Sequence, residues 1–368
     1  MDSLCLCGNN RIMDLPELEV LVGQMIVMDL RGVSIAPEME DMLRKGRLGG
    51  VLLFPGPEAT AWQVRELTDR IRGLAGEYPP IISIDQEGGR VTRLKQGFTT
   101  FPAMRKLGAK NDEVLAFEVG KILGAEMRAV GINTDFAPVV DLDLNPNNQV
   151  IGDRALSADR ETVARLGISL LRGLQSEKII TCAKHFPGHG ASREDSHLEL
   201  PTVDIDQQTT RSRELVPFQK MIAAGVETVM VGHIKYPAFD KYHPATLSER
   251  IIGELLREEM KFNGVVIVDS LEMKALEGIP LEDRAFMAAK AGADVMLIAE
   301  GIESAQRIHT ALCAAVKMGV LGADKVYLSF ERIMKLKEKL LKASDLPARA
   351  SLDQLVGTPG NKKIAESF

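Results

Sequence analysis

The chain has 368 residues, of which 45% are hydrophobic, and a formal net charge of −6. This composition supports a large buried core, and the absence of a basic block argues against a nucleic-acid partner. No stretch approaches the roughly 20 apolar residues that a membrane helix needs and no targeting signal is visible, so we expect a cytoplasmic protein without a membrane partner.

Short apolar runs alternate with longer amphipathic runs along the chain. The short runs are nearly continuous in Val, Ile, Leu and Met, which is typical of strands covered on both faces. They predict eight strands, at residues 25–29, 50–54, 81–85, 134–139, 179–184, 228–232, 265–269 and 294–298.

Helical patterns lie between and after these runs. They cover residues 59–74, 112–129, 159–175, 209–224, 249–261, 303–317 and 325–341, and Ser248 is the expected N-cap of the fifth. This alternation predicts an α/β protein with a single (β/α)8 TIM barrel, and a doubly wound open sheet is the alternative. We expect the barrel to occupy residues 1–345, with residues 346–368 as a loosely packed C-terminal extension.

Polar residues follow several of the predicted strands. In a (β/α)8 barrel the chemistry lies at the carboxyl ends of the strands. The residues at these ends are Asp29, Asp85, Lys184, His185, His233 and Asp269. Charged groups around the mouth of an apolar barrel predict a polar pocket of the size of a sugar.

Histidines are concentrated after the fifth predicted strand, in Lys184-His185-Phe186-Pro187-Gly188-His189-Gly190 and then Asp195-Ser196-His197. Three interpretations are open. The segment could be a structural turn. His185, His189 and His197 could bind a metal, although proline and glycine break the helix that would align them. Finally, Asp195 could orient His197 and stabilise its protonated form for catalysis.

Three other features carry candidate chemistry. Asp269 ends a fully apolar run, where it is either a helix cap or a nucleophile. Asp85 precedes a Gly-Gly pair, and its two carboxylate oxygens could accept hydrogen bonds from sugar hydroxyls. Arg154 lies on a long loop, where it could point inward or form a surface ion pair.

The segments together resemble glycoside hydrolase family 3, and within it the bacterial single-domain β-N-acetylglucosaminidases of peptidoglycan recycling. The motifs that carry the resemblance are DQEGGRVTR at 85–93, NTDFAPVVDLDLNP at 133–146, IGDRAL at 151–156, KHFPGHG at 184–190, DSH at 195–197 and VDSLEM at 268–273. Ala191 and Ser192 depart from the Asp-Thr that often follows HFPGHG in the family.

The resemblance implies roles for individual residues. Asp269 is expected to be the nucleophile, with His197 as general acid/base and Asp195 as its partner. The residues expected to bind the non-reducing N-acetylglucosamine are Asp85, Arg93, Arg154, Lys184 and His185. The implied activity is that of a retaining β-N-acetylhexosaminidase acting on small N-acetylglucosaminyl-anhydromuramyl sugars or peptides, with no metal and no cofactor.

Other functions remain open at this point. A phosphorylase would use the same residues with phosphate as the attacking group, a metal-dependent barrel hydrolase would use the three histidines, and a sugar-binding barrel would have no turnover. We expect the enzyme to be a monomer.

Overall fold

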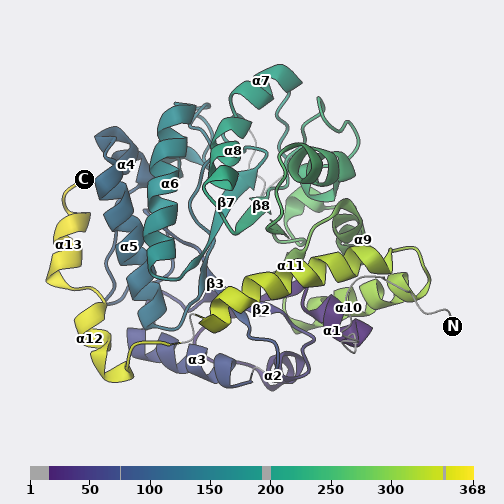
Figure 1. Ribbon diagram of the computed structural model, residues 1–368, viewed down its shortest axis with the longest axis horizontal. Helices are drawn as coiled ribbons and strands as arrows, with labels where there is room; N and C mark the ends of the chain where they lie inside the picture. The colour runs from purple at the N-terminus through teal and green to yellow at the C-terminus, as the bar shows by residue number, and fades with distance from the viewer. Residues whose placement is uncertain (1–15, 75, 193–199, 343–344) are drawn as a thin grey trace, which may run out of the picture.

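The computed structural model describes residues 16–74, 76–192, 200–342 and 345–368 (Figure 1). Eight parallel strands form a closed barrel in the order β1-β10-β9-β8-β7-β6-β3-β2. They are β1 Ile26–Arg31, β2 Gly50–Phe54, β3 Ile81–Ile84, β6 Thr134–Asp135, β7 Ile180–Phe186, β8 Thr228–Val231, β9 Val265–Val268 and β10 Val295–Ile298. All eight predicted strands are present, and barrel closure excludes the open sheet.

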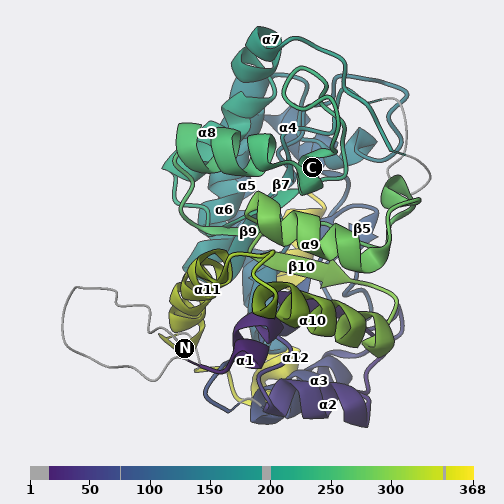
Figure 2. The same cartoon turned by 90° about the vertical axis from the view of Figure 1, so that its right-hand side faces the viewer.

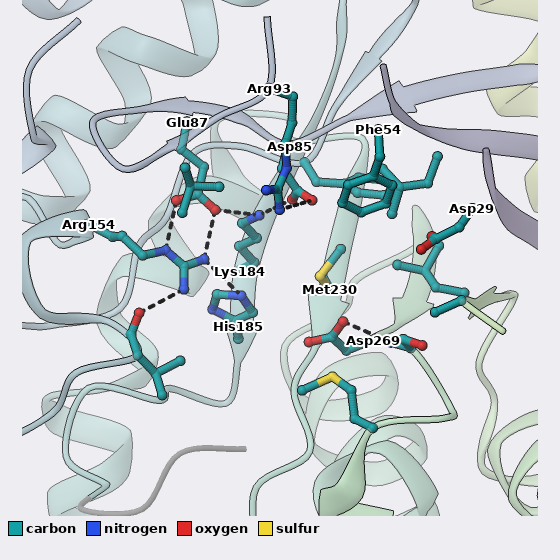
Figure 3. Close-up of a pocket in the computed structure, with 18 of the residues that line it drawn as sticks. Asp29, Phe54, Asp85, Glu87, Arg93, Arg154, Lys184, His185, Met230 and Asp269 are labelled. Atoms are coloured by element: carbon teal, nitrogen blue, oxygen red, sulfur yellow. Dashed lines mark hydrogen bonds and ion pairs between the residues drawn. The ribbon is translucent and has the colours of Figure 1, made fainter. Parts of the chain in front are cut away.

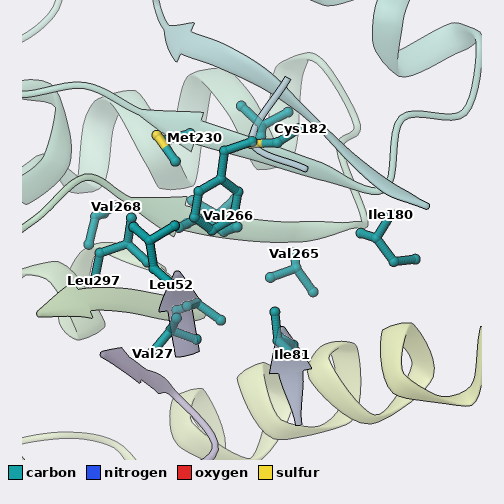
Figure 4. Packing of buried hydrophobic residues seen from close by; sticks show 14 of the residues in the cluster. Val27, Leu52, Ile81, Ile180, Cys182, Met230, Val265, Val266, Val268 and Leu297 are labelled. Atoms are coloured by element: carbon teal, nitrogen blue, oxygen red, sulfur yellow. The ribbon is translucent and has the colours of Figure 1, made fainter. Parts of the chain in front are cut away.

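The barrel strands are rich in β-branched and aliphatic residues, which fit a sheet buried on both faces. Every residue of β3, β7, β8, β9 and β10 is buried. Figure 4 shows side chains from different strands of the barrel packed together, among them Val27, Leu52, Cys182 and Val266. This core fixes the positions of the strand ends, and so of the residues that follow them.

Helices surround the barrel. They are α1 Leu18–Gly23, α2 Pro37–Arg44, α3 Ala61–Leu74, α4 Met104–Lys110, α5 Glu113–Ala129, α6 Arg160–Ser176, α7 Gln207–Ser212, α8 Leu215–Ala223, α9 Leu281–Ala291, α10 Ile302–Lys317, α11 Ala323–Lys342, α12 Leu352–Leu355 and α13 Pro359–Ala365. A π-helix covers Arg250–Glu259, and the Oγ of Ser248 accepts a hydrogen bond from the Ile251 amide at 3.1 Å, as expected of a cap. None of the helices in the described ranges is long and apolar enough to span a membrane.

The helix predicted at 209–224 is two helices, α7 and α8. The cause is Pro217, which has no amide hydrogen to donate to the residue 213 carbonyl and would clash with that carbonyl in a continuous helix. In the structure Pro217 lies in the first turn of α8, where a proline is tolerated.

Both ends of the described chain pack on the outer helices. Helix α1 lies beside α10 and α11 (Figure 2), and α12 and α13 pack on α5 (Figure 1). Leu352 is fully buried, and Glu126 of α5 accepts hydrogen bonds from the Gly357 amide at 2.9 Å and the Asn361 side chain at 3.0 Å. The expectation of a loosely packed extension is therefore wrong, whereas its boundary at residue 346 stays a prediction.

Candidate active site

A cavity of about 510 Å³ opens at the carboxyl ends of the barrel strands (Figure 3). Six of the residues predicted from the sequence line it together: Asp85, Arg93, Arg154, Lys184, His185 and Asp269. The predicted acid/base pair, Asp195 and His197, lies outside the described residues. The cavity has the size of a small-molecule site.

Lys184, on β7, is the buried centre of the polar cluster. Its Nζ lies 2.6 Å from Asp85 Oδ1 and 2.7 Å from Glu87 Oε1. Burial alone would lower the pKa of Lys184, but the two carboxylates reverse that effect and raise the pKa above its usual value. Lys184 is therefore a charged donor held in one position at the wall of the cavity.

Glu87 also forms an ion pair with Arg154. It lies in a hairpin formed by β4 Gln86–Gly88 and β5 Val91–Thr92, whose turn uses the positive φ angles of Gly88 and Gly89, 93° and 60°. Two hydrogen bonds, of 2.8 and 2.7 Å, join the Arg154 guanidinium to the Glu87 carboxylate. Burial would raise the pKa of Glu87, but Arg154 and Lys184 hold it well below its usual range. Arg154 thus points inward.

Asp141 fixes the orientation of His185. Its Oδ2 lies 2.7 Å from His185 Nδ1 and also accepts a hydrogen bond from the His185 backbone amide. Its Oδ1 accepts a hydrogen bond from the His189 backbone amide at 2.7 Å. Because an ionised carboxylate can only accept, the Nδ1 of His185 carries a hydrogen. Nε2 lies 3.4 Å from Arg154 Nη2.

Asp269 follows β9, as predicted. Its Oδ1 accepts a hydrogen bond from the Ser270 backbone amide at 2.8 Å. The Nε2 of the buried His233 donates a hydrogen bond to the Ser270 backbone carbonyl at 2.7 Å. Burial would raise the pKa of Asp269, but His233, His185 and Lys184 lower it below its usual value. The carboxylate is therefore ionised at neutral pH and is held at one edge of the cavity.

Strand order places Asp85 and Asp269 on opposite sides of the cavity. Asp85 follows β3 and Asp269 follows β9, and three strands separate these two on either side of the closed barrel. β6, β7 and β8 form one arc, which carries Lys184 and His185, and β2, β1 and β10 form the other. A small ring compound between Asp85 and Asp269 would contact both arcs.

Arg93 is less constrained than the rest of the cluster. Its guanidinium lies 4.8 Å from the centroid of the Phe54 ring and 3.9 Å from Asp85 Oδ2, and its buried Nε has no hydrogen-bond partner among the described residues. The described residues therefore do not use all of its donors.

His185 and His189, two of the three histidines of the metal interpretation, have partners at Nδ1, and His197 lies outside the described residues. The Nδ1 of His185 is hydrogen-bonded to Asp141, and the Nδ1 of His189 lies 2.8 Å from Ser192 Oγ. Burial lowers the pKa of His189 to about 4, so this ring is neutral. Among the residues with a described placement, no three His, Cys, Asp or Glu side chains come together to hold a metal ion.

Two buried carboxylates of the site were not predicted as site residues, although both lie within the quoted motifs. Glu87 is two residues after Asp85, and Asp141 ends the segment TDFAPVVD. For Asp141 a signal was present, because an acidic residue inside a mostly apolar stretch needs a partner, whereas Glu87 lies in the polar run DQEGGR. Their partners come from segments far apart in the sequence, so only the fold identifies them.

Residues 17–336 match the N-terminal domain of glycosyl hydrolase family 3. The chain belongs to glycoside hydrolase family 3. A beta-hexosaminidase of Nitrosomonas eutropha is 36% identical over 294 residues, which are 78% of this chain and 84% of that relative. The family and the class of enzyme, a glycoside hydrolase, agree with the expectation from the motifs.

Two solved structures resemble this barrel. A β-N-acetylglucosaminidase from Paenibacillus sp. str. FPU-7 has a TM-score of 0.91 and 38% identity, over 96% of this chain and 68% of its own. The β-glucoside phosphorylase BglX has a TM-score of 0.86 and 25% identity, over 96% of this chain and 64% of its own. A barrel similar to this one thus occurs in proteins with both names.

Proposed function

We propose that this family 3 chain is a retaining β-N-acetylglucosaminidase, which releases terminal β-linked N-acetylglucosamine from small sugars or peptides derived from peptidoglycan. One observation carries the proposal: an ionised Asp269 faces Asp85 across a cavity whose wall, on one arc, holds the donors Lys184 and Arg154. The proposal includes a monomer in the cytoplasm that needs no cofactor.

The sugar would lie between the two aspartates. Asp269 attacks the anomeric carbon, and the bond from that carbon to the leaving oxygen breaks. Asp85, at the far end, accepts hydrogen bonds from the hydroxyls. Lys184 and Arg154 donate to the same end of the ring, and their ion pairs fix them before the substrate binds, so little reorganisation is needed.

The acid/base role is assigned from sequence to His197 with Asp195. Two carboxylates about 5–5.5 Å apart serve most retaining glycosidases. A histidine differs because it is neutral or cationic and does not repel the nucleophile. Protonated His197 gives its proton to the leaving oxygen. The neutral ring then takes a proton from the water that hydrolyses the glycosyl-Asp269 ester, and the original state returns.

The dyad is tested with two substrates of different leaving-group acidity. His197→Ala should slow a natural disaccharide about 10²–10⁴-fold more than an aryl glycoside with an acidic phenol, because only the former needs its oxygen protonated. Asp195→Ala should show a weaker version, and the double variant should be little worse than His197→Ala. Equal losses on both substrates would contradict the acid role.

The activity itself is tested on aryl β-glycosides of N-acetylglucosamine, glucose and xylose, with and without inorganic phosphate. We expect release from the N-acetylglucosaminide, at a rate independent of phosphate. Release that depends on phosphate and yields a sugar 1-phosphate would favour the second candidate, a phosphorylase, to which the likeness to BglX points. No release from any glycoside would leave a sugar-binding barrel.

A further inference from the structure

The mechanism above gives no role to Asp29, a carboxylate of the cavity. Asp29 lies on β1, its side chain is 7% exposed, and it lines the same cavity as Asp269 and Asp85. Within the described residues, its side chain has one hydrogen bond, a long one of 3.4 Å to Arg31 Nη2. Arg31 itself is 72% exposed. A buried carboxylate with so little pairing is costly unless a ligand satisfies it.

The position of Asp29 is set by strand order. From β9 to β3, one arc of the barrel runs through β8, β7 and β6, and the other through β10, β1 and β2. Figure 3 shows the result, with Arg154 and His185 on one side of the cavity and Asp29 and Phe54 on the other. Asp29 therefore faces the ring edge opposite to the one that Lys184 and His185 contact.

The remaining wall of that arc is mostly apolar. From β2 and β10, the cavity is lined by Leu52, Phe54, Leu297 and Ala299. Two other charged residues of the arc, Arg31 and Glu300, are exposed to solvent. Among the described residues on β1, β2 and β10, Asp29 is thus the buried carboxylate; Glu272, which follows β9, is bonded through Oε2 to the Ala299 and Glu300 amides.

Sugar stereochemistry says which atoms face this wall. A pyranose with C1 at Asp269 has C4 at Asp85, since the two carbons are opposite in the ring. One edge is then C2–C3, and the other is C5 and the ring oxygen, with C6 attached to C5. The C2–C3 edge, which carries the acetamido group and a hydroxyl, fits the arc with the donors Lys184 and His185, whereas the ring oxygen and the C6 methylene fit the mostly apolar arc, so we place C6 toward β1.

We propose that Asp29 binds the C6 hydroxyl of the terminal sugar and makes the enzyme selective for substrates that carry it. The carboxylate accepts the hydroxyl hydrogen, while Leu52 and Phe54 contact the C6 methylene. This inference rests on the proposed function, because it uses Asp269 as the C1 end of the site.

The test compares aryl β-N-acetylglucosaminide with its 6-deoxy analogue, in the wild-type enzyme and in Asp29→Ala. The measured quantity is the ratio of the two kcat/KM values. A hydrogen bond to a charged acceptor predicts a wild-type ratio of about 10- to 100-fold. We expect the ratio in Asp29→Ala to fall to within about twofold of unity. Asp29→Asn, which keeps a neutral acceptor and the side-chain shape, should give an intermediate ratio and also serves if Asp29→Ala does not fold.

Glu300→Ala is the matched control, because it removes an exposed carboxylate from the same cavity wall. Its ratio should equal that of the wild type. A ratio unchanged in Asp29→Ala overturns the proposal. So does an Asp29→Ala variant that instead loses the preference for N-acetylglucosaminide over glucoside, since Asp29 would then face C2.

Failure of the proposed function gives a different result. If the wild type prefers glucosides or transfers sugar to phosphate, the proposed N-acetylglucosaminidase function fails. The ratio of kcat/KM values is then measured in the wild type and in Asp29→Ala with aryl glucoside and its 6-deoxy analogue. A ratio that collapses in Asp29→Ala then supports the role of Asp29 without N-acetylglucosaminidase activity.

Discussion

At the carboxyl ends of the barrel strands, charged side chains face a cavity, whereas at the amino ends charged side chains are hydrogen-bonded to other residues of the protein. Asp294, just before β10, has no exposed surface, and both of its oxygens are bonded, to Arg257, Arg332 and the Val266 amide. Asp269, just after β9, has a single hydrogen bond, from the Ser270 amide, among the described contacts.

The difference shows how a barrel separates stability from chemistry. A buried charge whose hydrogen bonds are complete holds helices against strands, and its loss leaves a partner unpaired. A buried charge with spare capacity costs stability until a ligand supplies the missing partner. At Asp269, the incomplete hydrogen bonding therefore marks a carboxylate that faces the cavity.

The largest effect is expected at Asp269. Asp269→Ala should reduce kcat by at least roughly 10³-fold, because a nucleophile contributes several kcal/mol to the barrier. The variant should stay folded, with a Tm equal to or above that of the wild type. Steady-state kinetics and thermal unfolding check both halves, and more than about a tenth of wild-type kcat would end the assignment.

Asp294 should show the reverse behaviour. Asp294→Ala leaves Arg257 and Arg332 without their carboxylate, and we expect a loss of about 3–5 kcal/mol in the free energy of unfolding. Asp112→Ala, which removes an exposed N-cap of α5, is the control and should cost about 1 kcal/mol. kcat/KM per folded molecule should stay at the wild-type value in both. A large fall in kcat/KM at full folding would break the separation of the two ends.

The sequence predicts the strands of the barrel better than it predicts the residues of the candidate active site. The sequence predicts all eight strands because each is a local apolar run. It also indicates Asp85, Lys184 and Asp269 as site residues, because each stands at the carboxyl end of such a run. The helical pattern over 209–224 is continuous, and Pro217 alone marks the break between α7 and α8. Glu87 and Asp141 were not predicted because their partners, Arg154 and His185, come from distant segments. The positions of Asp195 and His197 stay a prediction.

Lys337 of α11 is a further buried charge at the amino ends. Its Nζ donates to Gln24 Oε1 at 2.7 Å and to the Gly49 carbonyl at 2.8 Å, and burial lowers its pKa to about 7. Since the pKa is higher in the unfolded chain, the unfolded state binds more protons between about pH 7 and pH 10, and stability should rise with pH over that range.

Lys337→Met should remove this contribution. Urea unfolding at pH 6 and pH 9 should give a wild-type free energy of unfolding that increases more between the two values than that of the variant. Parallel changes in the two proteins would mean that the two hydrogen bonds keep the ammonium charged when folded.

Asp29 is the counterpart of Lys337 at the site, and here pH should change selectivity instead of stability. Burial raises the pKa of Asp29 to about 7, and the nearby Asp85, Glu272 and Asp269 raise it too, while Arg31 lowers it. The ionised form is lost as pH falls through about 7. The ratio of kcat/KM for the 6-hydroxy and 6-deoxy substrates should therefore decrease below that pH, and titration of groups common to both substrates cancels in this ratio.

Arg31→Met gives the smallest expected effect and tests which group is responsible. Without the guanidinium, the pKa of Asp29 should move further up, so the ratio should begin to fall at a higher pH. Because Arg31 is largely exposed, an ion pair of this kind contributes only about 0.2–1 kcal/mol, and the ratio at neutral pH should change by about fivefold at most. Added salt should shift the wild-type curve toward that of the variant, since it screens the same pair. If the curves of wild type and Arg31→Met coincide at low salt, the group that titrates is not Asp29.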